Sequence, residues 1–185
     1  MLSIKAWVEP WRTGSSGVDG STEQVEAAQR LGIEGVEQAD IFETLSKEAP
    51  EALDCIVTFD LIEHFDRDEL ILLVDCIRRA LGPGGRWIIH TPNAESPFGM
   101  RTRYGDLTHE LAFTRTSLAQ LLLSSGFSQV NFYEDQPVAH GVKSAARWVL
   151  WKGLRSLLRL YLAVETGDTG RDAIFSQNLL AVAFK

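Results

Sequence analysis

The sequence has few cysteines and no long apolar run, and each of these absences excludes a class of protein. Its 185 residues include two cysteines, Cys55 and Cys76, each within an apolar segment. This excludes a disulfide framework and predicts two buried thiols in a reducing compartment. No stretch reaches the roughly 18 uncharged apolar residues of a membrane-spanning helix, and residues 1–10 lack the apolar run and cleavage site of a signal peptide. These absences predict a cytoplasmic protein.

Basic residues are outnumbered, which makes nucleic acid an unfavourable partner. Lys and Arg number 18 and Asp and Glu 25, so the net charge is −7 and the protein repels phosphate backbones. The basic residues are unevenly spread, because the segment 143–159 contains five of them and no acid. The sequence has no internal repeat, low-complexity tract or linker, and its length suits a single domain over 1–185.

Apolar periodicity predicts strands that alternate with helices. The expected strands are 15–19, 35–39, 53–59, 86–91, 127–133 and 178–185. The expected helices are 2–11, 22–31, 66–81 and 114–125, with a long polar loop over 92–113. The run Leu53–Phe59 is rich in β-branched residues and is typical of a strand buried on both faces. This order of elements indicates an α/β fold with a doubly wound, Rossmann-like sheet.

Three successive strands are expected to end on an acid, namely Asp19, Asp40 and Asp60. Ligands of such sheets bind beyond the carboxyl ends of the strands. A carboxylate can accept hydrogen bonds from both hydroxyls of a ribose, which is a role that suits Asp19. The alternative role is to cap the helix that begins at Thr22, and the two roles are compatible.

Four motifs resemble those of class I S-adenosylmethionine-dependent methyltransferases, from the second strand of that family onward. They are Gly-Val-Asp-Gly-Ser at 17–21, Ala-Asp-Ile-Phe at 39–42, Phe-Asp-Leu-Ile-Glu-His-Phe at 59–65 and Leu-Gly-Pro-Gly-Gly at 81–85. The resemblance implies that S-adenosylmethionine is the cofactor and that its contacts are Asp19, Gly20, Asp40, Ile41, Phe59, Asp60 and Leu61. In this family arrangement Asp19 holds the ribose diol, and Asp40 and Ile41 flank the adenine. The segment 59–61 lines the pocket beside the methionine moiety.

The first strand of that family and the glycine-rich turn after it have no counterpart in this sequence. Residues 2–11 match the later part of the helix that follows the turn, and the glycine-rich segment 13–17 leads into the second strand. The expected fold is therefore N-terminally truncated, and the neighbours of the missing central strand are expected to lose a hydrogen-bonding partner. A gene start assigned too late is favoured over a remnant that binds its cofactor poorly.

The segment from Asp60 to His64 resembles an acid-x-x-Glu-His motif of ubiquinone-type and small-RNA 2′-O-methyltransferases. The resemblance implies that Asp60, Glu63 and His64 bind a divalent cation such as Mg²⁺, with His109 completing the set. Such an ion lowers the pKa of a coordinated hydroxyl. In the alternative, Glu63 caps backbone amides, His64 packs beneath the cofactor, and His109 or Glu110 acts as the general base.

The loop 104–114 resembles the acceptor-side segment of methyltransferases that act on small molecules, lipids or sugars. The implied function is O-methylation of a small-molecule, sugar or lipid-linked acceptor. One competing function is a non-catalytic, methyltransferase-like binding or scaffold module without the cofactor loop. Another is a nucleotide-sugar enzyme, although the sequence lacks the Tyr-x-x-x-Lys pair of one common group.

A basic amphipathic helical insert is predicted at 136–177, before the last strand. Between Val142 and Ala163 it combines tryptophans and leucines, expected on one face, with five basic residues on the other, which is typical of a helix that lies in a lipid headgroup layer. The alternatives are a lid packed on the sheet and the contact of a homodimer. The insert therefore adds a peripheral membrane location to the cytoplasmic prediction.

Overall fold

The computed structural model describes residues 15–136, 138 and 140–185, so the helix predicted at 2–11 lies outside the described residues. The strands are β1 (Gly17–Asp19), β2 (Val36–Gln38), β3 (Leu53–Phe59), β4 (Leu81–Pro92), β5 (Gln129–Glu134) and β6 (Asn178–Phe184). The helices are α1 (Thr22–Arg30), α2 (Ile41–Lys47), α3 (Arg67–Ala80), α4 (Gly99–Gly105), α5 (Arg115–Ser124) and α6 (Val142–Thr166), with a 3₁₀ turn η1 (Ile62–His64). The predicted α/β class is confirmed, as is a helical insert before the last strand.

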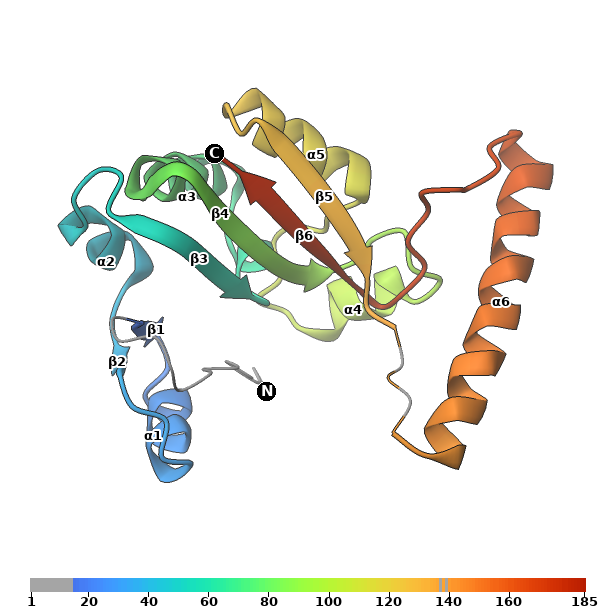
Figure 1. Ribbon diagram of the computed structural model, residues 1–185, viewed down its shortest axis with the longest axis horizontal. Helices are drawn as coiled ribbons and strands as arrows, with labels where there is room; N and C mark the ends of the chain where they lie inside the picture. The colour runs from blue at the N-terminus through green and yellow to red at the C-terminus, as the bar shows by residue number, and fades with distance from the viewer. Residues whose placement is uncertain (1–14, 137, 139) are drawn as a thin grey trace.

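The described strands form two separate sheets (Figure 1). β1 pairs with β2 in parallel, and the other four strands lie in the order β3-β4-β6-β5. β3 and β4 are parallel, whereas β6 runs antiparallel to both of its neighbours. Within the part of the chain that the structure describes, β1 and β3 each pair with a strand on one side only. Among the described residues, each of these two strands therefore has one unpaired edge, which agrees with the expected loss of a hydrogen-bonding partner.

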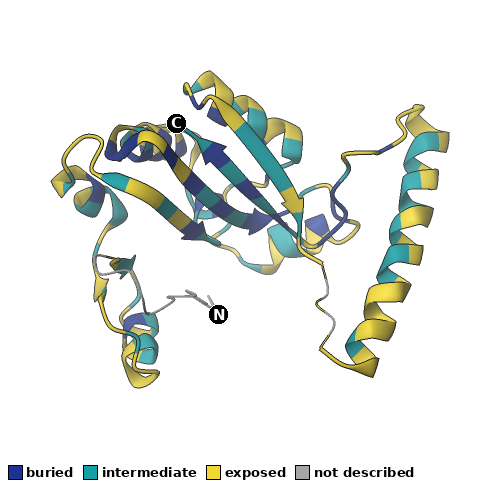
Figure 2. Ribbon diagram, in the orientation of Figure 1, coloured by how far each residue is buried: buried dark blue, intermediate teal, exposed yellow. Residues whose placement is uncertain are grey.

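The main core lies between the four-stranded sheet and helices α3 and α5. Alternate residues of β4 point into it, so that Trp87 and Ile89 are fully buried. The Trp87 indole Nε1 donates a hydrogen bond to Thr58 Oγ1 at 3.0 Å. Leu73 of α3 and Leu118 of α5 are buried in the same cluster. Figure 2 shows the buried positions concentrated along β4 and β6, which makes these strands the rigid support for residues at their ends.

β3 is not buried on both faces, so the prediction from its apolar sequence is wrong. β3 lies at an edge of the four-stranded sheet, and its residues Val57, which is 49% exposed, and Cys55, which is exposed as well, lie on the face opposite the one that carries Trp87 and Ile89. The predicted burial of the two thiols is wrong for Cys55, and Cys76 on α3 is half-buried. An apolar, β-branched run is therefore compatible with an edge position here.

The starts of two helices agree with the sequence analysis. Asp66 caps α3, and Glu69 completes a capping box by accepting a hydrogen bond from the Asp66 backbone. Thr114 caps α5. Helices α2 and α4 were not predicted, and α4 lies within the segment 92–113 that was expected to be loop.

Helix α6 stands apart from the sheet, at one side of the molecule (Figure 1). None of its residues is buried, although it is 25 residues long. It lies between β5 and β6 in the sequence, inside the predicted insert. A search of the described residues found no helix with the length and apolar character needed to cross a membrane.

Candidate functional site

The carboxyl ends of β1 and β2 lie next to each other because the two strands pair in parallel. The Asp19 carbonyl accepts a hydrogen bond from Ala39 N at 3.2 Å, which joins the two strand ends. The half-buried Asp19 side chain accepts from Ser21 N through Oδ1 at 2.7 Å, so it also orders the turn before α1. A Cβ added at Gly20 would meet no atom of the described residues within 4 Å, so none of them fills the space beside Asp19.

Asp40 has a structural role that the sequence analysis missed. Its Oδ1 accepts from Phe42 N at 2.8 Å and from Glu43 N at 3.0 Å, which makes it the N-cap of α2. The signal was present, because Glu43 follows the acid by three residues as in a capping box. Ile41 begins α2 and packs against the main core. The structure thus brings Asp19, Asp40 and their neighbours together at one edge of the two-stranded sheet.

The second group of predicted cofactor contacts follows β3, where the backbone turns sharply. Asp60 adopts a left-handed conformation with φ of 46°, which is uncommon for a residue with a side chain and typical of functional sites. Its N donates to the His90 carbonyl at 2.9 Å, and its Oδ1 lies 2.9 Å from His90 Nδ1. The Phe59 ring lies 5.4 Å from the His90 ring, and Leu61 is half-buried. His90 therefore fixes the position of this strand end.

The Asp60–His90 pair predicts a pH dependence of stability. The hydrogen bond to Asp60 raises the pKa of His90 above its ordinary value of 6.5, against the opposite effect of burial, and the charges of Asp60, Asp135 and Glu63 add to the rise. The pair therefore stabilises the fold fully below pH about 6.5, and this contribution disappears as the pH rises through the folded-state pKa. We expect His90→Gln to lower the urea midpoint more at pH 6 than at pH 8.5.

Exposed His140 offers the matched control for this experiment. His140→Gln should shift the urea midpoint by the same small amount at both pH values. Equal losses at pH 6 and pH 8.5 for His90→Gln would contradict the role given to the pair.

Glu63, His64 and His109 form a compact cluster of potential metal ligands. One ligand atom from each residue lies within 4.8 Å of the others. The cluster is held together by the backbone, because the Glu63 carbonyl accepts from Glu110 N at 2.8 Å and from Leu111 N at 3.0 Å. These bonds bring the loop after α4 against η1, which positions His109 beside His64 with ring centroids 4.7 Å apart.

A chain of hydrogen bonds fixes the tautomer of His64. Thr108 Oγ1 donates to Asp106 Oδ1 at 2.7 Å, so at its 3.0 Å contact with His64 Nδ1 the hydroxyl can only accept. Nδ1 therefore carries the proton, and Nε2 has a free lone pair. The two hydrogen bonds from Thr108 lower the pKa of Asp106, which keeps the acceptor at the end of this chain ionised.

His109 is oriented in the same way. Its Nδ1 lies 3.1 Å from the Thr102 carbonyl, which can only accept, so the lone pair of this ring is on Nε2 too. Arg103 supports the loop by donating to the carbonyls of His109 and Glu110. A hydrogen bond from the distal ring nitrogen to a carbonyl is the usual support of a metal-binding histidine.

Two atoms of the cluster are buried without a hydrogen-bond partner in the described part of the chain, namely Glu63 Oε1 and His64 Nε2. The other carboxylate oxygen, Glu63 Oε2, accepts from Thr91 Oγ1 at 2.9 Å. Burial raises the pKa of Glu63 from 4.5 to about 7, with hydrogen bonds to its backbone and Thr91 acting in the opposite direction. Two buried acceptors of this kind lack a hydrogen-bond donor or a cation as their partner.

The predicted residues are thus partly assembled. Glu63, His64 and His109 lie together, whereas Asp60 binds His90 and is outside the cluster. Glu110 is exposed and contributes its backbone to the site. The Glu63 side chain accepts hydrogen bonds from Thr91 Oγ1 and from its own backbone amide, and it caps no amide of another residue in the described part of the chain.

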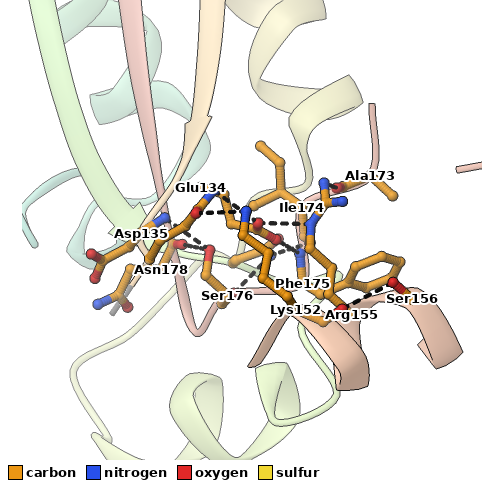
Figure 3. Close-up of polar contacts among 12 residues, drawn as sticks. Glu134, Asp135, Lys152, Arg155, Ser156, Ala173, Ile174, Phe175, Ser176 and Asn178 are labelled. Carbon is orange, nitrogen blue, oxygen red and sulfur yellow. Dashed lines mark hydrogen bonds and ion pairs between the residues drawn. The ribbon is translucent and has the colours of Figure 1, made fainter. Parts of the chain in front are cut away.

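A cavity of about 550 Å³ lies away from all of the predicted site residues. It is formed by β5, the start of α5, α6 and the segment 171–174, and three arginines line it: Arg115, Arg155 and Arg171. Figure 3 shows Arg155 reaching from α6 toward β5 at this place. The sequence analysis missed the cavity because its arginines come from three distant segments without a shared motif.

Comparison with known families and proteins gives one family match and no match to a curated protein. Residues 6–131 match the family described as "Methyltransferase domain". None of the curated proteins matches the sequence.

Solved structures with the same fold include S-adenosylmethionine-dependent methyltransferases. One from Archaeoglobus fulgidus is 20% identical with a TM-score of 0.65, over 91% of this chain and 75% of that chain. One from Mesorhizobium loti is 18% identical with a TM-score of 0.55, over 91% and 79%. The phosphoethanolamine N-methyltransferase 2 of Haemonchus contortus, in complex with S-adenosyl-L-methionine, is 17% identical with a TM-score of 0.54, over 92% and 43%. At these identities the likeness establishes the Rossmann-like fold.

Proposed function

Since this chain belongs to the S-adenosylmethionine-dependent methyltransferases, we propose that it methylates a hydroxyl group of a small-molecule, sugar or lipid-linked acceptor. Residues 1–185 act as one domain in this proposal, with 136–177 as an insert. The observation that carries the choice of a hydroxyl is the partly buried cluster of Glu63, His64 and His109, in which the unpartnered Glu63 Oε1 and His64 Nε2 suit a divalent cation.

The residues at the strand ends fit the cofactor. Asp19 presents a half-buried carboxylate beside the open space at Gly20, as a ribose diol requires. Asp40 keeps one oxygen for capping α2, so its second oxygen is the one that would meet the adenine amino group, with Ile41 against the ring face. Phe59, Asp60 and Leu61 would line the methionine side, where the hydrogen bond from His90 holds the Asp60 carboxylate in place.

The donor set of the cluster is two imidazole nitrogens and one carboxylate oxygen. Mg²⁺ prefers oxygen ligands, whereas two histidines and a carboxylate suit Zn²⁺, Mn²⁺ or Co²⁺. When bound, such an ion would lower the pKa of the acceptor hydroxyl. Glu63, His64 and His109 would be its ligands, and Asp60 would remain with His90.

Transfer of a methyl group to a hydroxyl requires few catalytic side chains. The acceptor oxygen forms a bond to the methyl carbon while the bond from that carbon to the sulfonium sulfur breaks, and the hydroxyl proton leaves to a base. Without a bound ion, His109 or the exposed Glu110 would be that base, and with the ion the proton can leave to solvent because the pKa of the hydroxyl is lowered; the rest of the catalytic effect comes from alignment of the two reactants. The segment 104–114 would contact the acceptor.

Calorimetric titration tests this proposal. We expect S-adenosylmethionine to bind the full chain at one site, and we expect Mn²⁺ or Zn²⁺ to bind separately and more tightly than Mg²⁺. Methyl transfer to a panel of hydroxyl acceptors should then depend on the added ion and stop with a chelator.

A non-catalytic binding module is the second candidate, and the separation of the described strands into two sheets favours it. In that case the folded chain would show no heat of binding with S-adenosylmethionine. Transfer that is unaffected by chelation would refute the cation site and leave the cofactor site standing.

A further inference from the structure

Helix α6 exposes an apolar face that no other described segment covers. Six side chains, each at least half exposed, define this outer face: Val149, Leu150, Leu154, Leu157, Leu160 and Val164. Their exposed fractions range from 50% for Leu154 to 80% for Val164. With 3.6 residues per turn, the six positions span an arc of about 140°. Between Val149 and Val164 no charged residue falls on this arc. An uncharged apolar surface of this extent indicates an interaction site.

The opposite side of α6 is fixed to the rest of the molecule (Figure 3). Arg155 donates to Glu134 Oε2 at 2.8 Å and to the Ala173 carbonyl at 3.2 Å, and Lys152 donates to Gln136 at 3.1 Å. The Glu134 side chain is only 6% exposed. Turning the outer face toward the sheet, as a lid requires, would leave this carboxylate buried without Arg155, which is costly. The contacts therefore argue against a lid.

The two tryptophans do not share the leucine face, contrary to the sequence analysis. Trp151 is half-buried with its Nε1 covered, so it lies on the anchored side. Trp148 lies on the anchored side as well, one turn before Lys152, whose Nζ is 5.3 Å from the indole centroid. Leucine and valine side chains thus form the outer face, which directs a mutational test toward them.

Charge distinguishes a lipid surface from a second copy of the chain. α6 contains five basic residues and a single acid, Glu165, although the chain as a whole carries −7. Exposed Lys143 and Arg147 flank the outer face in the first turns of the helix. Lys152 and Arg155 lie on the anchored side, so Lys143 and Arg147 are the charges beside the outer face. A second copy would present the same two positive charges there, whereas anionic lipid headgroups supply the opposite charge.

We propose that α6 docks on an anionic lipid surface, lying flat in the headgroup layer with its outer face toward the acyl chains. A helix of 25 residues is about 37 Å long, and lying parallel to the surface turns all six side chains toward the acyl chains along its length. The anchoring through Arg155 would then hold the rest of the domain beside the membrane. The proposal is independent of which acceptor is methylated.

Vesicle flotation tests the docking. The full chain is mixed with vesicles of phosphatidylcholine alone or with about one third phosphatidylglycerol. We expect binding to the anionic vesicles and at most weak binding to the neutral ones. Leu150→Glu/Leu157→Glu should reduce the fraction bound at least about tenfold, because two leucines that would insert among the acyl chains are replaced by charged side chains. Lys143→Gln/Arg147→Gln should weaken only the anionic preference, by about fivefold per basic residue.

Leu31→Glu is the matched control, since Leu31 is a 79% exposed leucine at the end of α1. Its flotation should equal that of the wild type, and circular dichroism melting should show that every variant folds. Absence of flotation with anionic vesicles would overturn the proposal. Equal binding to neutral vesicles would overturn it as well. So would a stable dimer in light scattering that Leu150→Glu/Leu157→Glu dissociates without lipid.

Discussion

Glu63→Gln is expected to lower methyl transfer by about 10²- to 10⁴-fold while the affinity for S-adenosylmethionine stays the same. The substitution keeps the shape of the side chain and the bond from Thr91, but removes the negative charge that the two histidine lone pairs would share with a cation. Affinity for Mn²⁺ or Zn²⁺ should fall in parallel. Initial rates and calorimetry on the same preparation measure the two effects.

Glu110→Gln is the matched control, because Glu110 is an exposed acid in the same loop that meets the cluster through its backbone alone. It should change the rate by less than about threefold if the cation site operates, since the residue would then have no proton to remove. The reverse result, with a large loss in Glu110→Gln and none in Glu63→Gln, would identify Glu110 as the base and refute the cation site.

Asp19→Ala is expected to weaken S-adenosylmethionine binding by about 100-fold. A carboxylate that accepts from both ribose hydroxyls makes two charge-assisted hydrogen bonds, each worth about 1.5 kcal/mol or more. Asp19→Asn should cost about tenfold, because the amide keeps an acceptor for Ser21 N and for one hydroxyl. Titration with S-adenosylhomocysteine gives the same comparison without turnover.

Glu37→Gln, at an exposed acid of the neighbouring strand β2, is the control that separates a direct contact of Asp19 with the ribose from a general effect of negative charge. It should leave cofactor affinity unchanged. A loss in Glu37→Gln as large as in Asp19→Ala would instead indicate that the charge of this edge matters and that Asp19 has no special contact.

Local sequence signals predicted most of the described elements. Asp66 and Thr114 cap the helices they were expected to cap, and the strand Leu53–Phe59 has the predicted bounds. Helix caps and strand bounds depend on residues that are close together in the chain, so a single sequence is enough to predict them. Helix α2 was missed because its seven residues are too few for a clear period, and the Asp40 cap was interpreted only as a ligand contact.

Burial and spatial grouping were harder to predict, because they depend on residues far apart in the chain. The sequence could not show that β3 lies at an edge, since the apolar content of a strand does not reveal whether one or two strands pair with it. It grouped Glu63, His64 and His109 through a motif resemblance, but it also included Asp60, whose partner His90 is 30 residues away. The arginine-lined cavity requires three segments to meet and has no local signal.

The division of the strands into two sheets has a consequence for cooperativity. Before β3, the buried residues of the described chain are Val25 and Leu45 alone, and a two-stranded sheet is barely stable by itself. The β1–β2 pair should therefore open at a lower free energy than the four-stranded sheet, as a separate unit of hydrogen exchange. Asp19 belongs to that unit. A cofactor bound there would raise the local stability of the weakest part of the molecule, so that binding and the final ordering of the fold would be one thermodynamic event.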